Sequence, residues 1–157
     1  MFLIFYYSGT KYELTNEIQR FMQIVTNSNK SSYYEDEEYI NLGYEVLNIS
    51  IWLVDMLDEM NIETYAKEEY GINANIDMSI DIFSKVKPDT YGIGLDYIAK
   101  FLVYLCNKDD GDIVMTDEGS AVIFIRKNKE IKIYKELWKE RFENENLYVD
   151  GQVKYPE

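Results

Sequence analysis

Carboxylates are the side chains through which this chain could carry out chemistry. It holds 29 acidic and 16 basic residues and no histidine. Pairs of carboxylates can act as general acid and base, or can hold a divalent metal ion for hydrolysis. Without histidine there is no Ser-His-Asp or Cys-His nucleophile system, no imidazole base and no HExxH zinc site. The residue types therefore leave carboxylate-dependent hydrolysis open.

Two local spacings of carboxylates resemble known kinds of site. Asp77 and Asp81 fall on one face of a predicted strand and could share a site, but the solvated side of an amphipathic strand explains them more simply. The run Asp109-Asp110-Gly111-Asp112 suggests a calcium loop. The EF-hand register would place Cys106 and Lys108 at ligand positions, so a turn is the better interpretation. We expect no metal and no cofactor.

The single cysteine, Cys106, cannot form an intrachain disulfide, a CxxC redox pair or a cysteine-rich zinc site. It lies in an apolar helical pattern, which predicts a buried thiol rather than a nucleophile. One thiol favours a reducing compartment, and the first residues lack the features of a signal peptide. No apolar run approaches the ~20 residues that a membrane helix needs. We therefore expect a cytoplasmic protein that binds no membrane.

The negative charge is concentrated in one segment. Residues 35–69 hold one lysine and 11 acids, a net charge of 1 − 11 = −10. Residues 120–157 hold eight bases and seven acids, a net charge of 8 − 7 = +1. Acidity disfavours unaided binding to nucleic acid, whose phosphates favour lysine and arginine. The segment predicts a surface that binds a basic partner or imitates a polyanion, or else one that only keeps the chain soluble.

Aromatic residues are interspersed with these acids, and such side chains anchor many protein interfaces while the surrounding charge speeds encounter. We therefore expect binding residues of two kinds, charged and aromatic. The charged candidates are Glu35, Asp36, Glu37, Glu38, Asp55, Asp58 and Glu59, and the aromatic candidates are Tyr39 and Trp52.

The hydrophobic pattern predicts an α+β fold. Strands are predicted at residues 2–7, 44–54, 75–83, 113–116, 121–126 and 130–135, and helices at 12–25, 61–70, 95–106 and 137–142. Gly71 would end the second helix, and residues 52–60 could alternatively be helical. The last three strands require antiparallel pairing. We expect one domain, residues 1–157, with a largely antiparallel sheet of about five to six strands, helices on one face, a C-terminal β-meander and a tail at 143–157 that frays.

An ordered series of segments between Ile62 and Leu137 carries a family resemblance. The series is a glutamate-rich helix ending in Glu69-Tyr70-Gly71-Ile72, the strand at 75–83, the helix at 95–106, Asp110-Gly111-Asp112-Ile113-Val114 and Ile123-Phe124-Ile125-Arg126. This order resembles small bacterial immunity proteins encoded beside polymorphic or contact-dependent toxins. In that family a glycine and an aspartate open a hairpin that carries an acidic turn and ends in an arginine. Gly111, Asp112, Glu118 and Arg126 match these positions, and residues of this kind are structural rather than part of a binding site.

The resemblance implies a stoichiometric inhibitor and not an enzyme. An immunity protein binds the toxin of its own lineage and occludes or distorts the active site. Many such toxins are nucleases with basic clefts, which an acidic surface can occupy. We therefore expect a cytoplasmic immunity protein, monomeric or weakly homo-oligomeric, that neutralises a cognate toxin. The alternatives are a nucleic-acid-mimicking inhibitor or other acidic binding module of phage or plasmid origin, and a carboxylate-dependent metal hydrolase.

Overall fold

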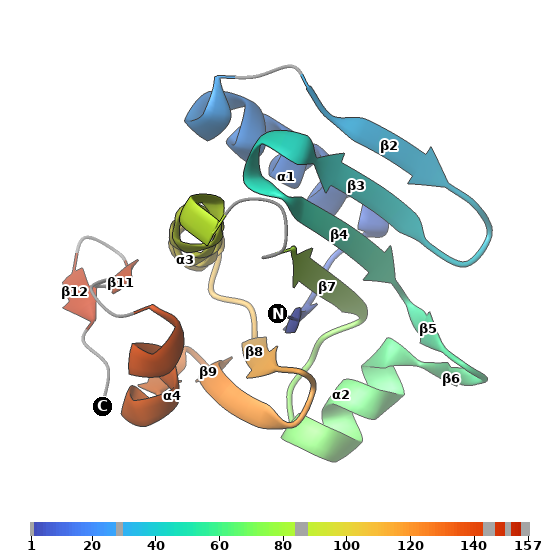
Figure 1. Ribbon diagram of the computed structural model, residues 1–157. Helices are drawn as coiled ribbons and strands as arrows, with labels where there is room; N and C mark the ends of the chain where they lie inside the picture. Colours follow the sequence, from blue (N-terminus) through green and yellow to red (C-terminus); the bar gives the residue numbers. More distant parts are fainter. Residues whose placement is uncertain (1, 28–29, 84–87, 143–146, 150–151, 155–157) are drawn as a thin grey trace.

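An eight-stranded antiparallel sheet runs through the molecule (Figure 1). The computed structural model describes residues 2–27, 30–83, 88–142, 147–149 and 152–154. The strands of the sheet are β1 (Phe2–Tyr7), β2 (Ser32–Glu35), β3 (Ile40–Tyr44), β4 (Ile49–Val54), β7 (Ile76–Ile82), β8 (Ile113–Asp117), β9 (Ala121–Lys127) and β10 (Glu130–Ile133). Their order is β10-β9-β8-β1-β7-β4-β3-β2. The predicted α+β class and the C-terminal meander of β8 to β10 are confirmed.

The alternation of side chains along β1 divides the core into two parts. Leu3 and Phe5 point into the main core, whereas Ile4 and Tyr6 point to the opposite face of the sheet. Because β1 lies between β7 and β8, it joins the N-terminal and C-terminal halves of the sheet. The main core accordingly extends from Leu3 to Phe142.

The sheet has more strands than the five to six expected, because residues 32–44 also form two of them. The strand expected at 44–54 begins later, at Ile49. Residues Glu45–Leu47 form a 3-10 turn, and Asn48 adopts a left-handed conformation with φ of 52°. This turn reverses the chain between β3 and β4, which pair with each other. Leu47 is buried, although it lies in this turn rather than in a strand.

Two long helices cover one face of the sheet. In α1 (Lys11–Thr26), Leu14, Ile18 and Met22 form a buried stripe at helical spacing. The helix α3 (Pro88–Lys108) packs on the same core, and the rings of Phe21 and Phe101 lie 5.2 Å apart. No helix within the described ranges is long and apolar enough to cross a membrane. Helical periodicity predicted both helices, but α3 begins at Pro88, seven residues before the expected start at residue 95.

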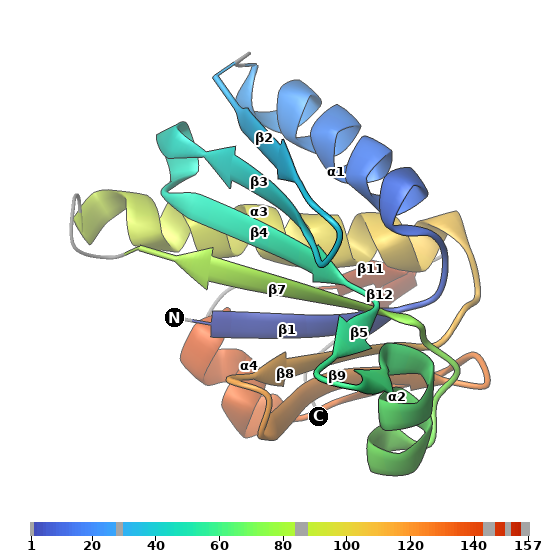
Figure 2. The same ribbon diagram turned by 90° about the vertical axis from the view of Figure 1, so that its right-hand side faces the viewer.

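The helix α2 (Ile62–Tyr70) departs from the expected arrangement because it covers the opposite face of the sheet. Ile62 and Ala66 pack with Tyr6 and Val114 in a separate small core, and Figure 2 shows α2 in front of the sheet and α3 behind it. Gly71 ends α2 in a left-handed conformation, as predicted. The helical alternative for residues 52–60 is wrong, because β4 is followed by a hairpin of β5 (Met56–Leu57) and β6 (Met60–Asn61).

The C-terminal region contributes one helix to the main core. In α4 (Lys135–Arg141) the Trp138 side chain is 1% exposed, and its ring lies 4.7 Å from that of Phe142. Part of the expected tail, β11 (Leu147–Val149) and β12 (Gln152–Lys154), forms a two-stranded hairpin. The other residues of 143–157 lie outside the described residues.

Replacement of the buried indole tests whether α4 belongs to the main core. We expect Trp138→Ala to lower the free energy of unfolding by about 3–5 kcal/mol, since it removes a large buried side chain and leaves a cavity. Urea denaturation followed by circular dichroism measures the change. Tyr134→Ala, in which a 38% exposed ring is removed, is the control and should cost less than about 1 kcal/mol. Equal unfolding midpoints for the two variants would contradict the packing.

Candidate protein-binding surface

The side chain of Asp36 stabilises the turn between β2 and β3 by accepting hydrogen bonds from its backbone. The Oδ1 atom of Asp36 accepts hydrogen bonds from the backbone N–H groups of Glu38 at 2.8 Å and Tyr39 at 3.0 Å. The backbone N–H of Asp36 donates to the Tyr39 carbonyl at 3.1 Å. These donors hold the pKa of the Asp36 carboxyl below its ordinary value. The turn is therefore fixed, and Glu37 and Glu38 are exposed at its tip.

Glu35 and Asp55 meet the first turn of α1 on the helix-covered side of the sheet. The phenol groups of Tyr12 and Tyr33 donate to the two carboxylate oxygens of Glu35 at 2.5 and 2.7 Å. These bonds lower the pKa of Glu35 and keep it ionised. Lys11 Nζ lies 3.3 Å from Asp55 Oδ1. Residues from α1, β2 and the end of β4 are thus brought together.

Aromatic side chains line the other side of the same end of the sheet. The ring of Tyr39 lies 5.7 Å from that of Tyr34 and 5.0 Å from that of Trp52. Tyr39 and Trp52, the two predicted anchors, are half-buried, whereas Tyr34 is 53% exposed. Tyr34 was not predicted as an anchor, although it directly precedes the acidic run. The predicted anchors therefore support a third ring that is more accessible than either of them.

The β5–β6 hairpin adds exposed apolar side chains that the sequence did not indicate. Met56, Leu57 and Met60 are 48%, 46% and 40% exposed. Asp58 and Glu59 form the tip, where Asp58 adopts a φ of 53°. Methionine is flexible and polarizable, and it suits surfaces that adapt to a partner. The available signal was the mixture of apolar and acidic residues in Met56-Leu57-Asp58-Glu59-Met60, which fits neither a buried helix nor a buried strand.

These groups lie at one end of the sheet, where the β2–β3 turn and the β5–β6 hairpin both project beyond β4 (Figure 1). We call this surface the acidic corner. It comprises Tyr12, Tyr34, Glu35, Asp36, Glu37, Glu38, Tyr39, Trp52, Asp55, Met56, Leu57, Asp58, Glu59 and Met60. A hollow of about 310 Å³ lined by Ser32, Gly43, Ser50 and Phe83, among others, lies toward the other end of these strands and includes none of the predicted binding residues.

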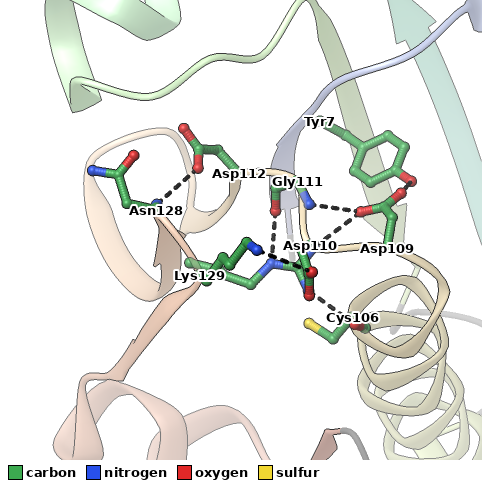
Figure 3. Close-up of polar contacts among 9 residues, drawn as sticks. Tyr7, Cys106, Asp109, Asp110, Gly111, Asp112, Asn128 and Lys129 are labelled. Carbon is green, nitrogen blue, oxygen red and sulfur yellow. Dashed lines mark hydrogen bonds and ion pairs between the residues drawn. The ribbon is translucent and has the colours of Figure 1, made fainter.

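A second polar cluster surrounds the buried side chain of Arg126, and Figure 3 shows the residues of this cluster. The Arg126 side chain is 2% exposed and donates to the carbonyls of Gly111 at 2.6 Å and Cys106 at 2.9 Å. Its Nη2 atom lies 3.1 Å from Asp109 Oδ1, and Asp109 Oδ2 accepts a hydrogen bond from Tyr7 Oη at 2.6 Å. The acids of this loop therefore hold chain segments together. The Cys106 thiol is buried, as expected.

Asp112 also joins segments that are distant in sequence. Its Oδ2 atom accepts the backbone N–H of Asn73 at 2.9 Å, and its Oδ1 atom accepts that of Asn128 at 3.0 Å. The loop before β7 is thereby connected to the β9–β10 turn. Gly111, Asp112 and Arg126 match positions of the family resemblance, and all three make internal contacts. Glu118, the fourth residue of that set, is instead exposed in the turn between β8 and β9, where its φ is 52°.

Asp77 differs from the solvated residue that the strand pattern indicated. It is 6% exposed, between Val54 of β4 and Tyr6 of β1 in the sheet register. Ser79 Oγ donates to its Oδ1 atom at 2.7 Å. Burial raises the pKa of Asp77 to about 6, against the effect of the Ser79 bond. Asp81, on the same face, is half-buried. Within the described ranges, no three aspartate, glutamate or cysteine side chains gather to hold a metal ion.

The raised pKa of Asp77 predicts a dependence of stability on pH. The fold favours the protonated carboxyl of Asp77. The contribution of this group to the free energy of unfolding is therefore fully present when the pH is below its ordinary pKa of 3.8, and it is lost as the pH rises through about 6. Asp77→Asn should raise the free energy of unfolding by up to about 3 kcal/mol near neutral pH, and by much less at acidic pH. Urea denaturation at several pH values measures this. Asp81→Asn is the control, and an equal gain from it would contradict the assignment to Asp77.

No protein-family model, curated protein or solved structure matches this chain. The acidic corner is thus the feature from which a function can be proposed.

Proposed function

We propose that this chain is a cytoplasmic immunity protein that binds a cognate toxin domain, most simply a nuclease, through the acidic corner. The observation that carries this proposal is the arrangement of exposed acids around exposed aromatic and apolar side chains at one end of the sheet. Acids alone would suit a merely solubilising surface. Exposed Tyr34, Met56 and Leu57 in their midst supply area that a partner can bury.

The charge of the acidic corner suits a basic cleft. Seven acids and the adjacent Lys11 give a net charge of 1 − 7 = −6. Lys11 is paired with Asp55, while Glu37, Glu38, Asp58 and Glu59 extend from two turn tips. Such charges steer a basic partner and repel acidic ones. Occupation of a substrate cleft by this surface would exclude an anionic substrate from it.

Charge reversal at the turn tip tests the electrostatic part of the proposal. Glu37 and Glu38 suit the test because Glu35 and Asp36 brace the local structure through their side chains. We expect Glu37→Lys with Glu38→Lys to lower the association rate constant with the toxin domain of the neighbouring gene by about tenfold at low salt. Surface plasmon resonance at two salt concentrations measures the rates, and the loss should shrink at high salt.

The control is Glu136→Lys with Glu140→Lys on the exposed side of α4, which changes the net charge equally at a distant place. The control should alter the rate by less than about twofold. Equal effects of the two double variants would show that only net charge matters, and would contradict the assignment to the acidic corner.

Removal of apolar side chains tests the contact itself. We expect Met56→Ala with Leu57→Ala to raise the dissociation rate constant about tenfold, because buried apolar area is lost from the complex. Co-expression with the toxin domain should then protect cell growth less well than the unchanged chain does. Ile24→Ala is the control, since Ile24 is 74% exposed near the far end of α1. Unchanged dissociation and full protection with the double variant would exclude the hairpin from the interface.

A further inference from the structure

The strand β2 is an open edge of the sheet. It is the last strand in the order, and in the described part of the chain it pairs with β3 alone. All four of its residues are exposed, and its register with β3 from Ser32 to Glu35 contains no bulge. An edge of this kind presents backbone N–H and C=O groups on which another strand can pair.

The hydrogen bond that closes the β2–β3 turn indicates which groups point outward. The backbone N–H of Asp36 donates to Tyr39, so these residues form a hydrogen-bonded pair. Antiparallel pairs alternate, so Tyr34 opposite Asn41 is the next such pair along the strand. Tyr33 and Glu35 fall between these pairs. Their backbone N–H and C=O groups therefore point away from β3, toward the open edge.

The two edges of the sheet differ in their protection. The opposite edge strand, β10, carries Lys132 and follows Lys129, and lysine on an edge discourages pairing with a further strand. The strand β2 has neither lysine nor proline, and acids follow it. An acidic strand would be repelled there, whereas a strand with basic side chains would be attracted. The β2 edge is thus open and selective for charge.

Side chains beside this edge are arranged to meet an added strand. Tyr12 and Tyr33, 59% and 49% exposed, hold the Glu35 carboxylate between their phenol groups on the α1 side. Figure 2 shows α1 running alongside β2. Tyr34 lies on the opposite side of the strand, with Tyr39 behind it. A strand paired with this edge would contact the Glu35 carboxylate, with Tyr12 and Tyr33, on one face of the sheet. On the other face it would contact the ring of Tyr34.

We propose that β2 accepts an extended segment of the partner protein as a ninth strand. The segment forms main-chain hydrogen bonds with Tyr33 and Glu35, and it places a lysine or arginine beside the Glu35 carboxylate. Main-chain pairing supplies affinity, and the neighbouring side chains supply specificity. This inference rests on the proposed function, because it states how the toxin domain docks on the acidic corner.

A proline at Tyr33 tests the main-chain contact. Tyr33→Pro removes the outward N–H, while the bonds between β2 and β3 involve other positions, and edge strands tolerate proline where the N–H faces solvent. Tyr33→Ala is the matched control, because it removes the same ring but keeps the N–H. We expect the proline variant to bind the toxin domain of the neighbouring gene at least about tenfold more weakly than the alanine variant. Equal affinities would overturn the proposal.

Hydrogen exchange of the unchanged chain makes the test independent of how well the proline variant folds. In the complex, the amides of Tyr33 and Glu35 should exchange more slowly than in the free chain. Unchanged exchange at both amides would overturn the proposal even if binding is tight, because the partner would then occupy another part of the acidic corner.

A peptide probe separates this inference from the proposed function. If the toxin domain does not bind at all, the proposed function fails, and the edge is tested with a short synthetic peptide of alternating lysine and threonine. Protection of the Tyr33 and Glu35 amides by this peptide, but not by a copy N-methylated on alternate amides or by a glutamate-threonine peptide, supports strand addition. No protection, or equal protection by all three, overturns it. Protection that instead grows with protein concentration without peptide would assign the edge to a second copy.

Discussion

Burial of the Arg126 guanidinium is the constraint on which the arrangement of the sheet depends. A buried cation is costly unless it is paired and its donors are satisfied. Arg126 meets this requirement with the carbonyls of Cys106 and Gly111 and with Asp109. Those partners come from the end of α3 and the loop before β8, while Arg126 itself lies on β9. The interaction therefore fixes where the chain leaves α3 and enters the sheet.

The position of β1 extends this constraint to the rest of the fold. Tyr7, at the end of β1, donates to the same Asp109 that pairs with Arg126. On its other side β1 pairs with β7, and β4, β3 and β2 follow outward to the edge. The acidic corner is thus attached to β3 and β4, two strands that bury side chains in the main core. Such a scaffold limits the entropy lost on binding, because the acids and rings are already in place.

The two clusters of acids in this chain illustrate how burial and partners decide the role of a carboxylate. Asp109 and Asp112 accept hydrogen bonds from distant segments and so maintain the fold. Glu37 and Glu38 are exposed at a braced turn and are available to a partner. Residue type and local spacing are similar in the two places. The contact partners distinguish them, and these are set by chain segments far away in sequence.

Sequence patterning was sufficient to predict helices and strands that bury one face, because their apolar residues recur at a regular spacing. The alternation over β7 and the helical stripe of α1 are consequences of one face being buried, so they were predicted correctly. The strand β2 was missed because all four of its residues are exposed, which leaves no alternation to detect. The β5–β6 hairpin was missed for a related reason, since its apolar side chains face solvent.

The sequence by itself determined that the chain has a concentrated acidic and aromatic segment, no histidine chemistry and an α+β pattern. Only the tertiary structure decided that Tyr12 meets Glu35, that Lys11 meets Asp55, and that Asp77 is buried rather than solvated. The physical reason is that charge and periodicity are properties of neighbouring residues. Burial and hydrogen bonding depend on the order in which strands pair, which brings together residues far apart in the chain.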